Sequence, residues 1–128
     1  MAKTVLIVDD AGFVRKTLTN ILSSAHYQIV GEAKDGFDAV QLYMKLRPDL
    51  TFMDIVMPNL SGIQSLGNIM QKDKEAKVIM VSAMNQEHII MEAIHAGAKD
   101  YILKPFSSDE ILRSAEHVIT GGQEAKVS

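Results

Sequence analysis

Short, mostly apolar runs recur along the chain, and they limit the folds it can adopt more than any other feature. Strands with one solvated face alternate apolar and polar residues, whereas continuous runs of this length are typical of strands buried on both faces. We therefore expect a central sheet that is covered on both sides. A weaker run over residues 28–33 accompanies the four clear ones, which are Val5–Val8, Leu50–Met53, Val78–Val81 and Tyr101–Leu103.

Amphipathic segments separate these runs. Apolar residues repeat at helical spacing over residues 14–25 and again over residues 111–119. Ser107–Glu110 has the pattern of a capping box that opens the last helix, and Pro48 and Gly97 stand where helices should end. Strands and helices that alternate five times predict right-handed crossovers. The expected fold is an α/β doubly wound three-layer sandwich, with five helices on the two faces of a five-stranded parallel sheet.

Length and composition are consistent with one domain. A chain of 128 residues buries enough surface to fold without metals or disulfides, and it contains no cysteine. We expect a single domain with a core over about residues 4–120, a tail over residues 121–128 and no output domain. No apolar run approaches the roughly 18 residues of a membrane span, and the N-terminus lacks a targeting pattern, so the expected location is cytoplasmic. A net charge of −3 argues against a nucleic-acid partner.

Polar residues follow four of the five apolar runs. Asp9 and Asp10 follow the first, Asp54 the third along the chain, Ser82 the fourth and Lys104 the fifth. In an open parallel sheet, ligands bind outside the carboxyl ends of the strands. We therefore expect three carboxylates, a hydroxyl and an ammonium group to converge on one edge of the sheet.

This combination of groups predicts a phosphoryl-transfer site. Two carboxylates about 4.5 Å apart repel each other by roughly 4 kcal/mol at an effective dielectric constant near 20, so a cation must offset the repulsion. Oxygen ligands without histidine or sulfur favour Mg²⁺, for which Mn²⁺ is expected to substitute. A metal ion, Lys104 and Ser82 around one carboxylate can stabilise a transferring phosphoryl group, which makes Asp54 the expected nucleophile.

Each of these residues also has a simpler interpretation. Asp9 and Asp10 could cap the helix that follows them, and Asp54 before a Met-Pro pair could be a turn residue. Ser82 and Lys104 alone would indicate nothing. Complementary polar residues at the ends of four buried strands are nevertheless hard to obtain from independent loop preferences, so the functional interpretation is favoured.

These residues, in this order, resemble the receiver domains of two-component response regulators, and especially their single-domain chemotaxis members, over about residues 4–120. The resemblance implies a flavodoxin-like strand order of 2-1-3-4-5, a cis Lys104-Pro105 bond and a histidine kinase that donates the phosphoryl group to Asp54. It also implies that the Val56 backbone carbonyl joins Asp9 and Asp54 around magnesium, with Asp10 contributing through water. The motifs that carry the resemblance are Val5–Asp10, Met53–Pro58, Ser82–Met84 and Ala96–Phe106.

The same resemblance implies a switch. Ser82 and Tyr101 match the family's switch pair, in which the hydroxyl moves toward the phosphoryl group and the aromatic ring follows. The surface of the fourth helix, fifth strand and fifth helix would then change and bind a target, expected to be a flagellar motor switch protein. In the fourth helix, apolar residues exceed what one buried stripe requires, and we expect Ile89 and Met91 to be partly exposed.

Two positions beside the expected site concern the lifetime of the phosphorylated state. Val56 and Met84 are apolar where some family members have an amide or carboxylate that orients the attacking water. This predicts slow self-dephosphorylation, and hence a separate phosphatase or transfer back to a kinase. The protein would catalyse only reactions of its own aspartate and would not be an enzyme in the usual sense.

Three other functions are alternatives. A haloacid-dehalogenase-type phosphatase needs a second aspartate two residues after the nucleophile, where this chain has Val56. A flavodoxin would bind the flavin phosphate in the loop that contains Asp9 and Asp10, which would repel it. A phosphorelay intermediate, which passes its phosphoryl group to a histidine phosphotransfer protein, has the same site residues and remains open. The protein is expected to be a monomer.

Overall fold

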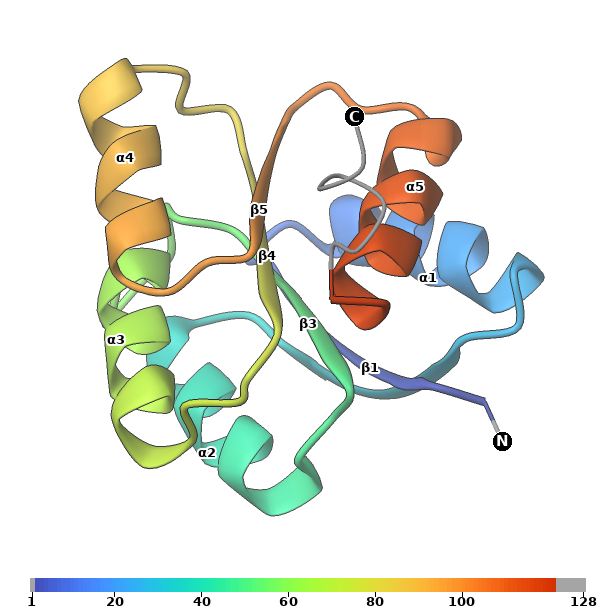
Figure 1. Ribbon diagram of the computed structural model, residues 1–128, viewed down its shortest axis with the longest axis horizontal. Helices are drawn as coiled ribbons and strands as arrows, with labels where there is room; N and C mark the ends of the chain where they lie inside the picture. Colours follow the sequence, from blue (N-terminus) through green and yellow to red (C-terminus); the bar gives the residue numbers. More distant parts are fainter. Residues whose placement is uncertain (1, 122–128) are drawn as a thin grey trace.

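The computed structural model describes residues 2–121, so the predicted tail lies outside the described residues except for Gly121. Five parallel strands form one sheet in the order β2-β1-β3-β4-β5, which confirms the expected order (Figure 1). β1 pairs with both β2 and β3 and is therefore an interior strand. The strands are β1 Thr4–Val8, β2 Gln28–Ala33, β3 Leu50–Met53, β4 Val78–Ser82 and β5 Asp100–Leu103.

Five helices cover the two faces of this sheet. In Figure 1, α1 and α5 lie on one side of the strands, and α2, α3 and α4 lie on the other. The doubly wound three-layer sandwich is thereby confirmed. The helices are α1 Gly12–Ser24, α2 Gly36–Leu46, α3 Gly62–Lys72, α4 Glu87–His95 and α5 Ser108–Ile119.

The core consists of two apolar clusters, one on each face of the sheet. In β1, Leu6 and Val8 belong to the cluster under α2, α3 and α4, whereas Val5 and Ile7 belong to the cluster under α1 and α5. All four side chains are at most 1% exposed. Successive residues of a strand point to opposite faces, so a strand with a core on each side must be apolar throughout.

The weaker apolar run over residues 28–33 forms an edge strand. β2 pairs only with β1 among the described strands, and its only fully buried residue is Ala33. An edge strand contacts fewer neighbours than a central one, so its sequence needs fewer apolar residues. β5, at the other edge, also has only one buried residue, Ile102.

The predicted helix ends are also present. Ser107 and Glu110 form the capping box of α5, in which each side chain accepts a hydrogen bond from the other's backbone N–H. After α4, Gly97 has a φ of +119°, a backbone conformation that residues other than glycine rarely adopt. The Lys104-Pro105 peptide bond is cis, as expected. Over residues 2–121, no helix has the length and apolar character needed to cross a membrane.

Candidate functional site

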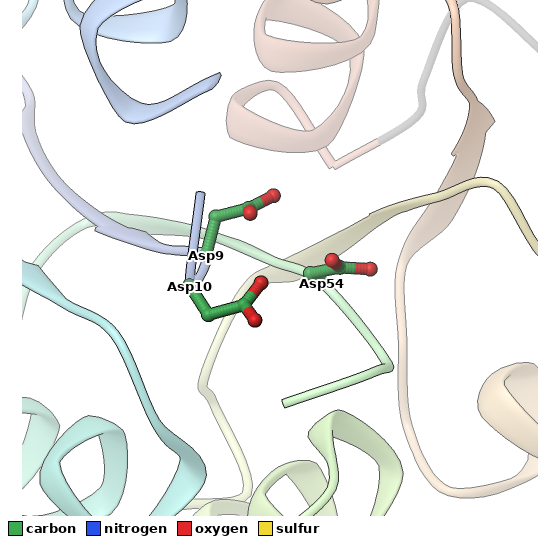
Figure 2. Close-up of side chains that lie close together, drawn as sticks. All are labelled: Asp9, Asp10 and Asp54. Carbon is green, nitrogen blue, oxygen red and sulfur yellow. The ribbon is translucent and has the colours of Figure 1, made fainter. Parts of the chain in front are cut away.

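Three carboxylates meet at the carboxyl end of the sheet. Asp9 and Asp10 directly follow β1, and Asp54 follows β3, the strand paired with it. Figure 2 shows the three side chains close together, and one carboxylate oxygen from each lies within 4.8 Å of the others. Asp9 and Asp54 are 1% and 7% exposed, whereas Asp10 is exposed. The site therefore has a buried floor and an open side.

Backbone N–H groups orient the two buried carboxylates. Oδ1 of Asp54 accepts a hydrogen bond of 2.7 Å from the Ile55 N–H, and Oδ1 of Asp9 accepts one of 2.9 Å from the Ala11 N–H. Asp9 and Asp10 do not cap α1, because the N-cap residue is Ala11 and no side chain caps this helix. The helix-capping interpretation of the aspartate pair is thus wrong.

Lys104 compensates part of this negative charge. Its Nζ donates to Oδ2 of Asp9 at 2.9 Å and to Oδ2 of Asp54 at 3.2 Å. Lys104 lies in the loop after β5. It is 95 positions from Asp9 and 50 positions from Asp54 in the chain, so the fold brings these residues together. One ammonium group faces three carboxylates, and the remaining negative charge favours binding of a further cation.

The pKa values at the site are consistent with this excess of negative charge. Burial raises the pKa of the Asp54 carboxyl group, and repulsion from Asp9 raises it further, although Lys104 acts in the opposite direction. Burial alone would lower the pKa of Lys104, but its hydrogen bond to Asp9 and its attraction to Asp54 and Asp9 outweigh that effect and raise it. Lys104 is therefore charged at neutral pH.

The donor set fits a hard divalent cation. All three side chains offer carboxylate oxygens, and hard ions such as Mg²⁺ prefer oxygen ligands. Mg²⁺ usually keeps several water ligands, and exposed Asp10 lies on the side of the site where water can enter. Three carboxylates from two adjacent strands could thus hold such an ion with water completing its coordination.

The two expected switch residues, Ser82 and Tyr101, are each hydrogen-bonded to the backbone of Met84. Ser82 is buried at the end of β4, and its Oγ accepts a hydrogen bond of 3.2 Å from the Met84 N–H. The hydroxyl of Tyr101 donates to the Met84 carbonyl at 2.7 Å. Burial raises the pKa of the Tyr101 hydroxyl, the nearby Ser82 hydroxyl acts in the opposite direction, and the charge of Asp54 raises the pKa further. The side chains of Ser82 and Tyr101 are thus both hydrogen-bonded to the loop after β4.

The remaining predicted residues lie around the site and on α4. Val56 is 60% exposed beside Asp54, and Met84 is partly buried. On α4, both residues predicted to be partly exposed are so: Met91 is 46% exposed, and Ile89 is half-buried, with part of its side chain packed against the core. Ile94, which the sequence analysis did not single out, is 39% exposed on the same helix.

Two further residues, Arg15 and Gly62, contact the backbone of the site aspartates and were not predicted. The Arg15 side chain donates to the Asp9 carbonyl at 2.7 Å and also forms an ion pair with Glu32 at 2.9 Å. Gly62, the first residue of α3, lies so close to Asp54 that a Cβ atom would be 2.0 Å from the Asp54 carbonyl oxygen. A glycine eight residues after Asp54 was the only signal in the sequence, and the close approach depends on tertiary structure.

Comparisons with known proteins agree with this geometry. Residues 5–116 match the model of the response regulator receiver domain. The chain is 47% identical to the chemotaxis protein CheY of Thermotoga maritima, over 92% of this chain and 98% of that protein. It is 51% identical to the protein CcdB of Bacillus subtilis, over 90% and 96% of the two chains.

Solved structures give the same result. A chain in the crystal structure of the CheX-CheY-BeF3-Mg²⁺ complex from Borrelia burgdorferi superimposes with a TM-score of 0.89 at 40% identity. The superposition covers 91% of this chain and 88% of that one. The response regulator domain of Thermotoga maritima CheB is similar at a TM-score of 0.87 and 39% identity, with 94% and 98% of the chains covered.

Proposed function

The chain belongs to the family of response regulator receiver domains, and from that premise we propose that it is a stand-alone switch phosphorylated on Asp54. The observation that carries this proposal is the cluster of three carboxylates with Lys104 bonded to Asp54. A stand-alone role is supported by the match to 98% of the length of the Thermotoga protein.

The proposed reaction is a phosphoryl transfer from a histidine kinase. A carboxylate oxygen of Asp54 forms a bond to phosphorus while the bond between phosphorus and the donor histidine nitrogen breaks, and the electron pair of that bond stays on the nitrogen. Lys104 already contacts Oδ2 of Asp54, so its charge can offset the negative charge of the transferred oxygens. Asp54 is assigned as the nucleophile because it follows β3, the middle strand of the sheet, and so lies between the two aspartates after β1 and Ser82 at the end of β4.

Asp9, Asp10 and Asp54 would hold the divalent cation, with the Val56 backbone carbonyl as a further ligand. When bound, Mg²⁺ supplies positive charge that stabilises the phosphoryl oxygens, and Mn²⁺ should replace it. The Borrelia complex is one of CheX and CheY with BeF3 and Mg²⁺, which supports this choice of metal.

The phosphoryl group would be detected by Ser82 and Tyr101. A new group with nearly two negative charges on Asp54 attracts the Ser82 hydroxyl, which now accepts from the Met84 N–H. Any movement of Ser82 changes the same loop to which the Tyr101 hydroxyl is bonded. The surface of α4, β5 and α5, where Met91, Ile94 and Leu103 are exposed, would then bind a target.

The proposed target is a flagellar motor switch protein, and the proposed location is the cytoplasm. The chemotaxis names of relatives at 46–47% identity from several bacteria support this assignment. The alternative is a phosphorelay intermediate that passes its phosphoryl group to a histidine phosphotransfer protein. The protein is proposed to act as a monomer and without contacting nucleic acid.

Phosphorylation of the purified protein tests the central proposal. With acetyl phosphate and Mg²⁺, the wild-type protein should gain the mass of one phosphoryl group, and chelation of the metal should prevent this. Asp54→Asn should remain unmodified, because its amide is not a nucleophile, whereas Asp73→Asn, a remote carboxylate, should react normally. Equal phosphorylation of Asp54→Asn would contradict the assignment.

A pull-down distinguishes the two proposed roles. The protein loaded with beryllofluoride and Mg²⁺ serves as bait for purified motor switch and histidine phosphotransfer proteins. Retention of the motor protein that depends on beryllofluoride supports a chemotaxis role. Retention of the phosphotransfer protein alone supports a phosphorelay.

The apolar side chains of Val56 and Met84 support slow self-dephosphorylation and hence a role for a separate phosphatase. Neither side chain can hydrogen-bond an attacking water. Val56→Asn should therefore shorten the half-life of the phosphorylated protein by about tenfold or more. A wild-type half-life of only seconds would contradict this proposal.

A further inference from the structure

The loop between β3 and α3, which carries Asp54, is closed on itself at its base. The Gly62 N–H donates to the Ile55 carbonyl at 2.8 Å, and the Asp54 N–H donates to the Val8 carbonyl at 3.0 Å. Residues 56–61 therefore form a closed loop, because the start of α3 at Gly62 is bonded to Ile55, the residue after Asp54. The Val56 carbonyl, proposed as a metal ligand, belongs to this closed loop.

The far side of this loop rests against α2. The Gly36 backbone is so close to the loop that a Cβ atom there would lie 1.9 Å from the Leu60 carbonyl oxygen. Ser65 of α3 adds a second contact, because its Oγ donates to the Gly36 carbonyl at 3.0 Å and to the Ser61 carbonyl at 2.9 Å. The first turns of α2 and α3 thus enclose the loop between them.

One carboxylate joins α2 to the tip of the loop. Oδ1 of Asp35 caps α2 by accepting from the Asp38 N–H at 2.8 Å, and its Oδ2 accepts from Nδ2 of Asn59 at 3.1 Å. Asn59 has a φ of +69°, a left-handed conformation that asparagine tolerates better than most residues. The side-chain bond and the backbone conformation at Asn59 therefore hold the tip of the loop in one place.

We infer, on the basis of the proposed function, that Asp35 and Asn59 are positioning residues for the metal site. Their hydrogen bond fixes the loop so that Asp54 and the Val56 carbonyl are arranged for the cation before it arrives. If the loop had to become ordered when Mg²⁺ binds, the free energy of ordering would weaken binding. A loop that is already ordered avoids this cost. Neither residue belongs to the carboxylate cluster itself.

The test compares variants that break this bond without breaking the helix cap. In Asp35→Ser, the hydroxyl still caps α2 but offers no second oxygen to Asn59. In Asn59→Gly, the left-handed conformation remains accessible while the amide is lost. The double exchange Asp35→Asn with Asn59→Asp reverses donor and acceptor and keeps the net charge. Tyr43→Phe, which removes a different contact between α2 and α3, is the matched control.

The Mg²⁺ dissociation constant of the full-length, unphosphorylated protein is measured by calorimetry. Asp35→Ser and Asn59→Gly should each bind Mg²⁺ about threefold to tenfold more weakly, the range expected for one lost hydrogen bond. Their combination should be no weaker than either alone, because both remove the same bond. The reversed pair and Tyr43→Phe should bind as the wild type does.

Other outcomes contradict the inference. Wild-type affinity in either disrupting variant, or losses that multiply in their combination, would show that the bond does not position the site. Asp54→Asn, measured in parallel, separates a failure of the positioning role from a failure of the metal site. If Asp54→Asn weakens Mg²⁺ binding and the loop variants do not, only the positioning role fails. If Asp54→Asn binds as the wild type does, the proposed metal site fails and the positioning role with it.

Discussion

The raised pKa of Asp54 means that its ionised form is less favourable in the folded chain than in the unfolded chain. A raised carboxyl pKa contributes stability below the unfolded pKa, and this contribution is lost as the pH rises through the folded pKa. At neutral pH, without metal, Asp54→Asn should therefore increase the free energy of unfolding by about 1 kcal/mol. Lys104 keeps its partner Asp9 in this variant.

Urea unfolding in the presence of a chelator checks this prediction. The gain from Asp54→Asn should be largest at neutral pH, should shrink as the pH falls through the raised pKa of Asp54, and should be absent below the ordinary pKa of an aspartate. A variant that is less stable than the wild type at neutral pH would show that the ion pair with Lys104 outweighs burial and repulsion.

Thr51 offers a second prediction. It is fully buried in β3, and among the described residues its hydroxyl oxygen has no hydrogen-bond partner. An unsatisfied buried hydroxyl costs about 1–3 kcal/mol, so Thr51→Val should raise the free energy of unfolding by about 1 kcal/mol. Leu6 of β1 is the register partner of Thr51, so a valine at this position would lie beside an apolar residue. A decrease in stability on chemical unfolding would indicate that the hydroxyl is hydrated.

Residue chemistry explains how much of the site could be predicted. Asp9, Asp54 and Lys104 were identifiable because their side chains carry charge and follow apolar runs. The Met84 carbonyl, which accepts from Tyr101, was not identifiable, because every residue has a carbonyl and only the fold decides which one is used. The roles of these residues in catalysis remain predictions.

At the scale of elements, one tyrosine contributes a buried hydrogen bond to the contact between α2 and α3. The buried Tyr43 donates to Oδ2 of Asp73 at 2.7 Å, and Arg47 also contacts this carboxylate at 3.2 Å. The hydrogen bond from Tyr43 is the main cause of the lowered pKa of Asp73. A lowered carboxyl pKa contributes stability above the unfolded pKa, and this is lost as the pH falls through the folded pKa.

Tyr43→Phe should therefore destabilise the protein by about 1–2 kcal/mol at neutral pH. The difference from the wild type should decrease below about pH 4, where Asp73 becomes protonated in the unfolded and then the folded chain. Urea titrations at several pH values measure both effects. A difference that is independent of pH would mean that packing of the ring, and not the charged partner, is responsible.

The elements differ in how well the sequence predicted them. Central strands such as β3 were evident because all four residues are buried, whereas β2 at the edge gave a weaker signal. Helix ends with local chemistry, such as the Ser107 cap, were also predictable. The contact between the first turn of α2 and the β3–α3 loop was not, because Gly36 and Leu60 are distant in sequence.

For the whole molecule, Mg²⁺ should act as a stabilising ligand. A ligand that binds only the folded state at 100 times its Kd adds about 2.7 kcal/mol to the free energy of unfolding. Saturating Mg²⁺ should thus raise the Tm by several degrees, and the rise should be smaller in Asp54→Asn and at low pH, where the carboxylates are protonated. An equal rise in the wild type and Asp54→Asn, measured by calorimetry, would exclude the proposed site.

The layers of the molecule were predictable from alternation alone, but the strand order was not. Right-handed crossovers place helices on both faces for several orders of five parallel strands. The order β2-β1-β3-β4-β5 was expected from the family resemblance and is confirmed. It makes β1 and β3 neighbours, and this places Asp9 beside Asp54.

The distribution of the site over the chain has a consequence for protein synthesis. The carboxylates of Asp9, Asp10 and Asp54 belong to the first half of the chain, whereas Lys104 follows the last strand. On the ribosome, the segments of β1 and β3 emerge before Lys104, whose ammonium group offsets part of the charge of these carboxylates, has been made. The nascent chain therefore carries an uncompensated acidic cluster, and cellular Mg²⁺ could serve as its temporary counterion until β5 completes the sheet.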